Sequence, residues 1–296
     1  MYQEKFYHSF PRIVGAPKES ENEHNQRGIT ILESIIKHGL LITPEIMKLP
    51  FELESWHSPL VQHRCCFTLI ERKDLENHCK LFGNFSIEWD TFLLKRIGIF
   101  PVFYLPIFDF EHGNHNEFVA PKFLYRMMNY HEYARECSKE AKENRDQLLR
   151  EGGPNGEVIK YEKDLLFFTE MKAWFEGLKN NIYPIDNAKY TKENGYYHQR
   201  EWKLPGNLKY NNKDIMELAT LQQQKELIHL NPTFFSKKIN YFNMNLKVAE
   251  ICLFFKELDS KHILSYANKI IVPSSQVDRV KGIISAANLN VNVEAL

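Results

Sequence analysis

The chain has 296 residues, of which 43% are hydrophobic and 13% aromatic, and its 38 basic residues equal its 38 acidic residues in number. This composition supplies a sizeable core and excludes a mainly disordered chain, and the balanced charge argues against nucleic-acid binding over the whole surface. No apolar run approaches the roughly 20 residues that a membrane-spanning helix needs, and no apolar signal segment follows the N-terminus. The five scattered cysteines without C-x-x-C spacing indicate reduced thiols. We therefore expect a cytoplasmic protein that makes no contact with a membrane.

Short strands and helices alternate along the first third of the chain. Runs rich in β-branched and aromatic residues predict strands at residues 6–10, 64–68, 85–89 and 101–105. Helical spacing of apolar residues, closed by a glycine in each case, predicts helices at 29–39, 74–82 and 91–97. We expect a polar loop at 17–26 and the start of a short helix at 43–45. This alternation favours a mixed α+β fold.

Two long helices are predicted in the middle of the chain. Residues 121–150 contain no internal proline or glycine and predict one helix, and residues 164–179 predict a second. We interpret residues 115–190 as a helical insertion in a single domain of residues 1–296. The core then resumes with a strand at 196–204. The remaining expected elements are helical or partly helical segments at 214–227 and 246–258 and a C-terminal tail with a strand at 269–273, a helix at 276–286 and a strand at 290–293.

Most familiar catalytic motifs are absent from the sequence. It contains no G-x-G-x-x-G, no G-x-x-x-x-G-K-[ST], no G-x-S-x-G and no H-E-x-x-H. These absences exclude the usual dinucleotide fold, the P-loop NTPases and the common serine hydrolases and zinc proteases. The cluster around His112 and His115 has residue types that bind metals, but loops rich in histidine are usually only polar, and we expect no metal site.

The strand at 196–204 carries the clearest candidate for chemistry. Strand alternation places Tyr197, Gln199 and Glu201 on one face. A carboxylate can stabilise the positive charge that develops at an anomeric carbon as a glycosidic bond breaks. A neutral imidazole, such as that of His8 in the first strand, can donate a hydrogen bond to a ribose hydroxyl. A solvated Glu201 and a structural His8 are the alternatives without chemistry.

Several segments, taken together, resemble the AbiGi-like abortive-infection family of bacterial phage-resistance proteins. The resemblance covers the core but not the helices of the insertion. The segments that carry it are Tyr7–Arg12, Ile31–Glu45, Cys66–Thr68, His78–Phe85, Pro101–Tyr104, Tyr196–Lys203 and Ile270–Pro273.

The order of these segments also resembles the DarT-like ADP-ribosyltransferase toxins, which implies a small, twisted sheet of the ADP-ribosyltransferase type. It further implies that Glu201 is catalytic and that NAD is the substrate. Gln199 departs from the second acidic residue that arginine-modifying transferases commonly carry, which favours a different acceptor. The residues expected to bind NAD are His8, near a ribose, Arg12, near the pyrophosphate, Phe67 and Thr68, at the nicotinamide, and Tyr197.

Three functions remain open at this stage. The leading hypothesis is a toxin-like enzyme of phage defence that cleaves NAD and transfers ADP-ribose to a macromolecule, either protein or nucleic acid. The second is a metal-dependent nuclease, because Glu201 and Lys203 have E-x-K spacing. The third is a non-catalytic sensor or antitoxin-like protein whose helical insertion binds a partner.

Overall fold

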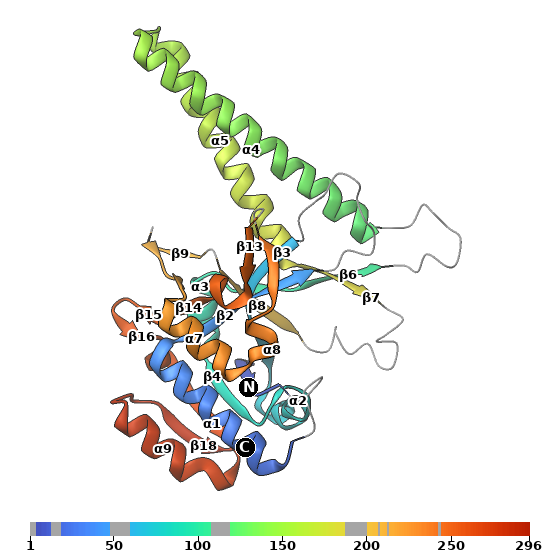
Figure 1. Ribbon diagram of the computed structural model, residues 1–296, viewed down its shortest axis with the longest axis vertical. Coiled ribbons are helices and arrows are strands. Elements are labelled where there is room, and N and C mark those ends of the chain that lie inside the picture. The colour runs from blue at the N-terminus through green and yellow to red at the C-terminus, as the bar shows by residue number, and fades with distance from the viewer. Residues whose placement is uncertain are drawn as a thin grey trace, which may run out of the picture. The chain divides into compact units, whose positions relative to one another are not determined.

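A computed structural model (Figure 1) describes residues 4–12, 19–47, 60–107, 119–186, 200–206, 208–211, 213–241 and 244–296. The chain divides into two compact units. The first comprises Met1–Lys48, Glu52–Val102 and Gly195–Leu296, and the second comprises Leu49–Phe51 and Phe103–Asn194. The second unit overlaps the helical insertion predicted at 115–190. The expectation that the whole chain folds as one domain stays a prediction.

The first unit is built on a ten-stranded sheet whose main path runs β11-β14-β2-β3-β1-β4-β17-β18, with β8 paired to β3 and β5 paired to β8. Its neighbouring strands are antiparallel except for the parallel pair β17 and β18. The strands are β1 (Lys5–Phe10), β2 (Leu40–Met47), β3 (Leu60–Ile70), β4 (Phe85–Trp89), β5 (Phe100–Pro101), β8 (Glu201–Pro205), β11 (Glu217–Leu218), β14 (Leu253–Phe255), β17 (Ala267–Val272) and β18 (Asn292–Ala295).

Helices cover this sheet, and small hairpins connect its strands. The helices are α1 (Glu21–His38), α2 (Leu75–Phe82), α3 (Thr91–Arg96), α7 (Leu221–Leu230), α8 (Pro232–Phe235) and α9 (Val277–Ala286). The hairpins pair β9 (Lys209–Tyr210) with β10 (Lys213–Asp214), β12 (Lys238–Tyr241) with β13 (Met244–Lys247), and β15 (Glu257–Leu258) with β16 (Lys261–His262). The prediction of a mixed α+β fold is confirmed, as is the C-terminal helix–strand tail.

One face of the sheet packs on α1 and α9 and forms the main core. Phe6, Phe67 and Trp89 lie on this face, and each is fully buried. Helix α1 approaches β4 closely at Gly28, where a Cβ atom would lie 2.4 Å from the ring of Phe85. A glycine is required there because no side chain fits between the helix and the sheet.

The opposite face of β1, β4 and β17 is covered by α2. Tyr7 and Ile271 from the sheet pack there against Leu75 and Cys79 from the helix. Because helices lie over both faces at this point, all five residues of β4 are buried. The sequence pattern predicted a half-buried strand, since alternation alone does not reveal a helix on the second face.

Two local predictions are wrong, and a third holds only in part. Residues 17–26 are not all loop, because α1 begins at Glu21, where Ser20 and Glu23 form a capping box. Residues 43–45 lie in β2 rather than in a helix. The segments expected to be helical or partly helical at 214–227 and 246–258 contain the start of α7 and the 3-10 turn Val248–Ile251, but they also contain β10, β11, β13, β14 and β15. Since β11 and β14 join the main sheet, that sheet is larger than the small one that was expected.

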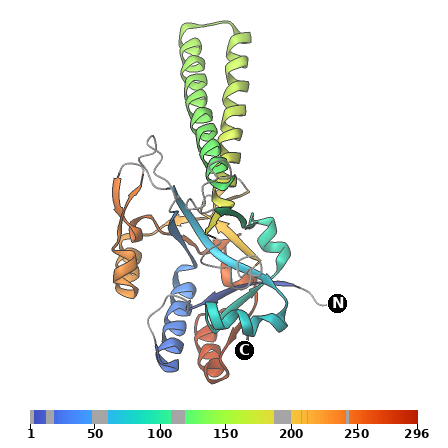
Figure 2. The ribbon, with the colours of Figure 1, turned by 90° about the vertical axis from the view of Figure 1, so that its right-hand side faces the viewer.

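The second unit contains a long helical hairpin and two short strands. Helix α4 (Val119–Glu151) and helix α5 (Asn155–Asn181) lie side by side, as Figure 2 shows. Strands β6 (Phe103–Ile107) and β7 (Ile182–Asp186) flank the hairpin in sequence and pair in parallel. Both predicted long helices are therefore present, and α5 is longer than expected. None of the helices that the structure describes has the length and apolar character to cross a membrane.

Candidate functional site

Strand β3 lies at the centre of the region where the sequence placed the NAD site. Strand β8 pairs with one edge of β3. On the other edge, the pairing with β1 ends at Thr68 and the pairing with β2 ends at Arg64. Between these two positions β1 and β2 diverge. There the Nδ1–H of His8 donates a hydrogen bond to the carbonyl oxygen of Cys66 at 2.9 Å. His8 therefore satisfies a backbone group of β3 at the point where the two strands separate.

The strand registers assign the predicted site residues to two different faces of the sheet. Residues directly opposite each other in paired strands point to the same side. Thr68 lies opposite Glu201, so these two side chains share a face. Phe67 belongs to the main core on the other face, and its ring centroid lies 5.5 Å from that of His8. The sheet thus brings Thr68 and Glu201 together and separates both from His8 and Phe67.

The side chain of His8 lies on the core side of the sheet and contacts residues of β1 and β3. Its ring is half-buried, lies 5.9 Å from the ring of Phe10 and has its Nδ1 atom 3.6 Å from the Sγ atom of Cys65. Burial lowers the pKa of His8, so the imidazole is neutral at pH 7. The Nδ1–H that would be offered to a ribose hydroxyl is already donated to Cys66.

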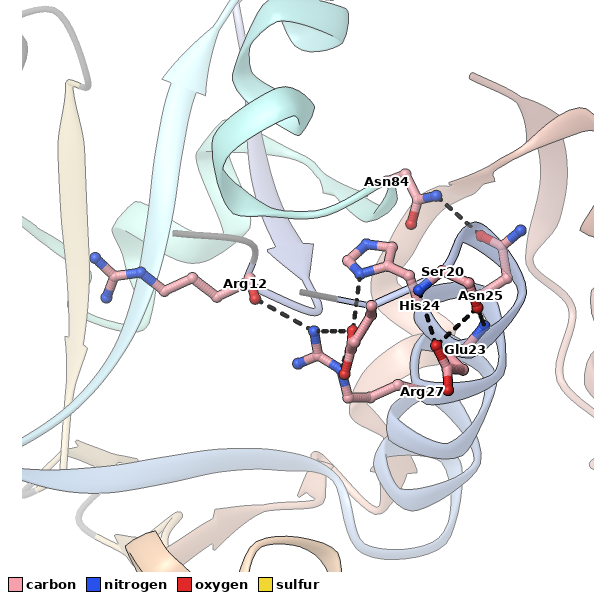
Figure 3. Close-up of polar contacts among 8 residues, drawn as sticks. Arg12, Ser20, Glu23, His24, Asn25, Arg27 and Asn84 are labelled. Carbon is pink, nitrogen blue, oxygen red and sulfur yellow. Dashed lines mark hydrogen bonds and ion pairs between the residues drawn. The ribbon is translucent and has the colours of Figure 1, made fainter. Parts of the chain in front are cut away.

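Arg12 lies at the end of β1, in a polar cluster at the start of α1 (Figure 3). Its carbonyl oxygen accepts a hydrogen bond from Arg27 at 3.4 Å, and Asn84 donates to Asn25 at 3.0 Å in the same cluster. The guanidinium of Arg12 points away from the cluster and lies 6.0 Å from the centroid of the Phe82 ring. Tyr197, the remaining residue expected to bind NAD, lies outside the described residues.

The face that carries Glu201 is polar and largely buried. Lys203 follows Glu201 by two positions and shares its face, opposite Cys66 on β3. The side chain of Lys203 is almost fully buried, and burial together with the nearby Arg64 lowers its pKa to about 8. Glu45 forms an ion pair with Arg64 on the same face. The sequence indicated Lys203 only through its E-x-K spacing from Glu201. Arg64 and Glu45 were not predicted, because no local sequence pattern marks them as part of a site.

Cys66 is exposed between these buried polar groups but is not poised for nucleophilic chemistry. Desolvation by the protein atoms around the Cys66 thiol raises its pKa, and the adjacent Glu201 carboxylate raises it further. The thiolate is the reactive form of cysteine, so this environment suppresses reactivity. Among the residues that the structure describes, no three His, Cys, Asp or Glu side chains are grouped to bind a metal. His112 and His115 lie outside those residues.

The residues predicted to bind NAD lie on two faces of the sheet. A single dinucleotide would have to contact His8 and Phe67 on one face of the sheet and Glu201 and Thr68 on the other. A bound ligand and its catalytic group must instead lie in one cavity, within hydrogen-bonding distance of each other. The individual roles of these residues stay predictions, but the structure does not bring them into one site.

A different surface of the first unit has the form of a binding site. An open groove of about 440 Å³ lies between α1 and α7, a volume within the usual range for ligand-binding clefts. Figure 1 shows these two helices beside each other. The groove is lined by Thr30, Glu33, Ser34, Lys37 and His38 from α1 and by Gln222, Lys225, Glu226, His229 and Leu230 from α7.

Ion pairs across the groove fix the two helices together. Glu226 of α7 accepts hydrogen bonds from Lys37 at 2.7 Å and from Nε2 of His38 at 2.7 Å. Together with a bond from Gln222, these contacts lower the pKa of Glu226 to about 2. The carboxylate is therefore ionised under all ordinary conditions, and the groove is a preformed feature of the fold.

Other side chains of the groove are available for a partner. Leu230 is 43% exposed at the end of α7. Among the ion pairs of the described residues, none includes Lys225 or His229. The groove thus offers an exposed apolar side chain beside a lysine and a histidine. Sequence reasoning missed it because α7 was expected as part of a longer helix, although Thr220 and Gln223 form a capping box that marks its start.

A comparison with protein families gives one result for this chain. A family model described as "Putative abortive phage resistance protein AbiGi, antitoxin" matches residues 58–265, which is more than half of the chain. No curated protein and no solved structure matches the chain. The matched region contains β3, β8, α7 and the hairpin of α4 and α5.

Proposed function

The chain belongs to the AbiGi family of abortive phage resistance proteins, and on that basis we propose that it is an antitoxin that acts by binding a protein toxin of its abortive-infection system. The observation that carries the proposal is the separation of His8 and Phe67 from Glu201 by the sheet. A protein that cleaves NAD needs those groups in one cavity, whereas a protein that neutralises a toxin by contact needs only a surface.

The groove between α1 and α7 is the surface that we assign to the toxin. Its helices are locked together by Glu226, so little conformational entropy is lost when a partner binds. Leu230 offers an apolar contact, and Lys225 and His229 offer hydrogen-bond donors. The complementary toxin segment carries an apolar side chain for Leu230 and an acidic side chain for Lys225.

Complex formation with the toxin tests this assignment. The purified protein and the toxin of the same system are mixed and followed by size-exclusion chromatography and calorimetry. Leu230→Asp and Lys225→Glu each weaken binding at least about tenfold, because central contacts of an interface typically contribute more than 1.4 kcal/mol. Leu218→Asp is the matched control, since Leu218 is 61% exposed on β11 and does not line the groove. The groove would be excluded as the toxin-binding surface if Leu218→Asp weakened binding as much as the groove variants do. It would also be excluded if neither groove variant weakened binding.

A metal-dependent nuclease is the second candidate function. The observation in its favour is that Glu201 and Lys203 share one face of β8, as the carboxylate and lysine of an E-x-K motif must. Nucleic-acid cleavage that requires a divalent metal, is abolished by a chelator and is lost in both Glu201→Gln and Lys203→Met would favour it. If nucleic acid stays intact with every divalent metal tested, the nuclease function is excluded.

A further inference from the structure

The hairpin of α4 and α5 carries aromatic side chains in two neighbouring groups of contacting rings, which together we call the aromatic surface. Within it, Tyr133 contacts Phe168, which in turn contacts Phe167, and Tyr130 stacks on Phe175, which contacts Trp174. The two sets of rings are one turn apart on α4 and two turns apart on α5. The aromatic surface consists of Tyr130, Tyr133, Phe167, Phe168, Trp174 and Phe175.

These rings are exposed to a degree that is unusual for aromatic residues. Tyr130, Tyr133, Phe167 and Trp174 are 54%, 58%, 57% and 61% exposed, whereas Phe175 is buried against α4. With roughly 200 Å² for each full aromatic side chain, they leave about 500 Å² of exposed apolar area on the hairpin. The largest apolar patch of a typical monomer has about this size and is often functional.

The distribution of apolar residues around α5 shows what kind of partner the hairpin needs. Val158 and Phe175 are buried, but Leu166, Phe167 and Trp174 are apolar and exposed. A helix that is apolar on more than one side is normally packed on more than one side. Helix α4 covers one side of α5, and the remaining apolar side is suited to packing against a further helix.

Charge and area favour a second copy of this chain as that partner. Lys and Arg equal Asp and Glu in number over residues 119–181, so two hairpins do not repel each other and a polyanion is not attracted. Two aromatic surfaces face to face remove about 1,000 Å² from water, which reaches the lower limit for a specific interface. Two antiparallel hairpins packed in this way form a four-helix bundle, the usual means of burying such faces.

We propose that the aromatic surface binds the same surface of a second copy of this chain, so that the protein dimerises through a four-helix bundle of two α4–α5 hairpins. The interface is two-fold symmetric, so Trp174 of each copy contributes to it. We expect a weak dimer with a dissociation constant on the order of micromolar, because the interface lies at the lower limit of size for a specific one. This dimerisation does not depend on the groove between α1 and α7.

Sedimentation velocity of the full chain over about 1 to 100 μM tests the proposal. The wild type shifts with concentration from the 35.1 kDa of one chain to twice that mass. Trp174→Glu and Phe167→Glu each keep the protein monomeric over the whole range. Leu149→Glu is the matched control, because Leu149 is also an exposed apolar residue of the hairpin, at 58%, but lies outside the aromatic surface. Its dimerisation is unchanged, and far-UV circular dichroism confirms that every variant keeps its helices.

Three outcomes would overturn the proposal. The first is a wild type that remains monomeric at 100 μM. The second is a dimer that Trp174→Glu and Phe167→Glu leave intact, or that Leu149→Glu dissociates to the same extent. The third is a monomeric wild type whose complex with the toxin is lost in Trp174→Glu, which would assign the aromatic surface to the toxin instead.

Discussion

The close approach of α1 to β4 gives a sharp test of how the main core is packed. A Cβ atom at Gly28 would lie 2.4 Å from two carbon atoms of the Phe85 ring, far inside van der Waals contact. The ring is fully buried and stacks on Phe10 at 5.9 Å, so it has little room to move. Gly28→Ala therefore costs about 1–3 kcal/mol through overpacking and regains about 1 kcal/mol through helix propensity. The expected net result is destabilisation of up to about 2 kcal/mol.

Gly282→Ala in α9 is the matched control for this substitution. Gly282 is also inside a helix, but no atom lies within 4 Å of a Cβ atom placed there. The substitution is therefore expected to stabilise the protein by about 0.5–1 kcal/mol. Urea unfolding followed by circular dichroism measures both changes. If Gly28→Ala raises the midpoint as Gly282→Ala does, then α1 does not approach β4 in the way described.

Two further predictions concern buried and paired carboxylates. Tyr7 donates a hydrogen bond of 2.9 Å to the buried carboxylate of Glu88. Tyr7→Phe is therefore expected to lower the free energy of unfolding by about 1–3 kcal/mol. A loss below about 0.5 kcal/mol in urea unfolding would contradict this expectation. The pKa of Glu226 falls from 4.5 to about 2 on folding, chiefly through its bond from Lys37. Its contribution to stability is therefore complete above pH 4.5 and lost as the pH falls towards 2. The stability difference between wild type and Glu226→Gln should shrink over this range, and a constant difference would refute the ion pair.

Elements with strong local signals could be predicted from the sequence. Strand β4, helix α3 and helix α9 lie close to where the periodicity of their residues placed them, and Asp90 caps α3. The start of α1 was missed although the Ser20 and Glu23 capping box was present in the sequence. The segment at 246–258 was misjudged because short apolar runs look alike in a buried strand and a buried helix.

The candidate site depended on long-range pairing that the sequence does not display. Alternation within β8 correctly separates the face of Glu201 from that of Trp202, since Glu201 lies opposite Thr68 and Trp202 lies against the core. Whether His8 shares the face of Glu201 depends on the registers of β1, β3 and β8, and no local pattern fixes a register between distant strands. The groove between α1 and α7 likewise joins residues almost two hundred positions apart.

Growth of cells that express the toxin of the same system tests the proposed function most directly. We expect the wild type and Glu201→Gln both to restore growth, because protection depends on contact and not on a catalytic carboxylate. Lys225→Glu, at equal protein level, should fail to restore growth. A Glu201→Gln protein that is folded and still binds the toxin, yet no longer protects, would contradict neutralisation by contact and return Glu201 to a catalytic role.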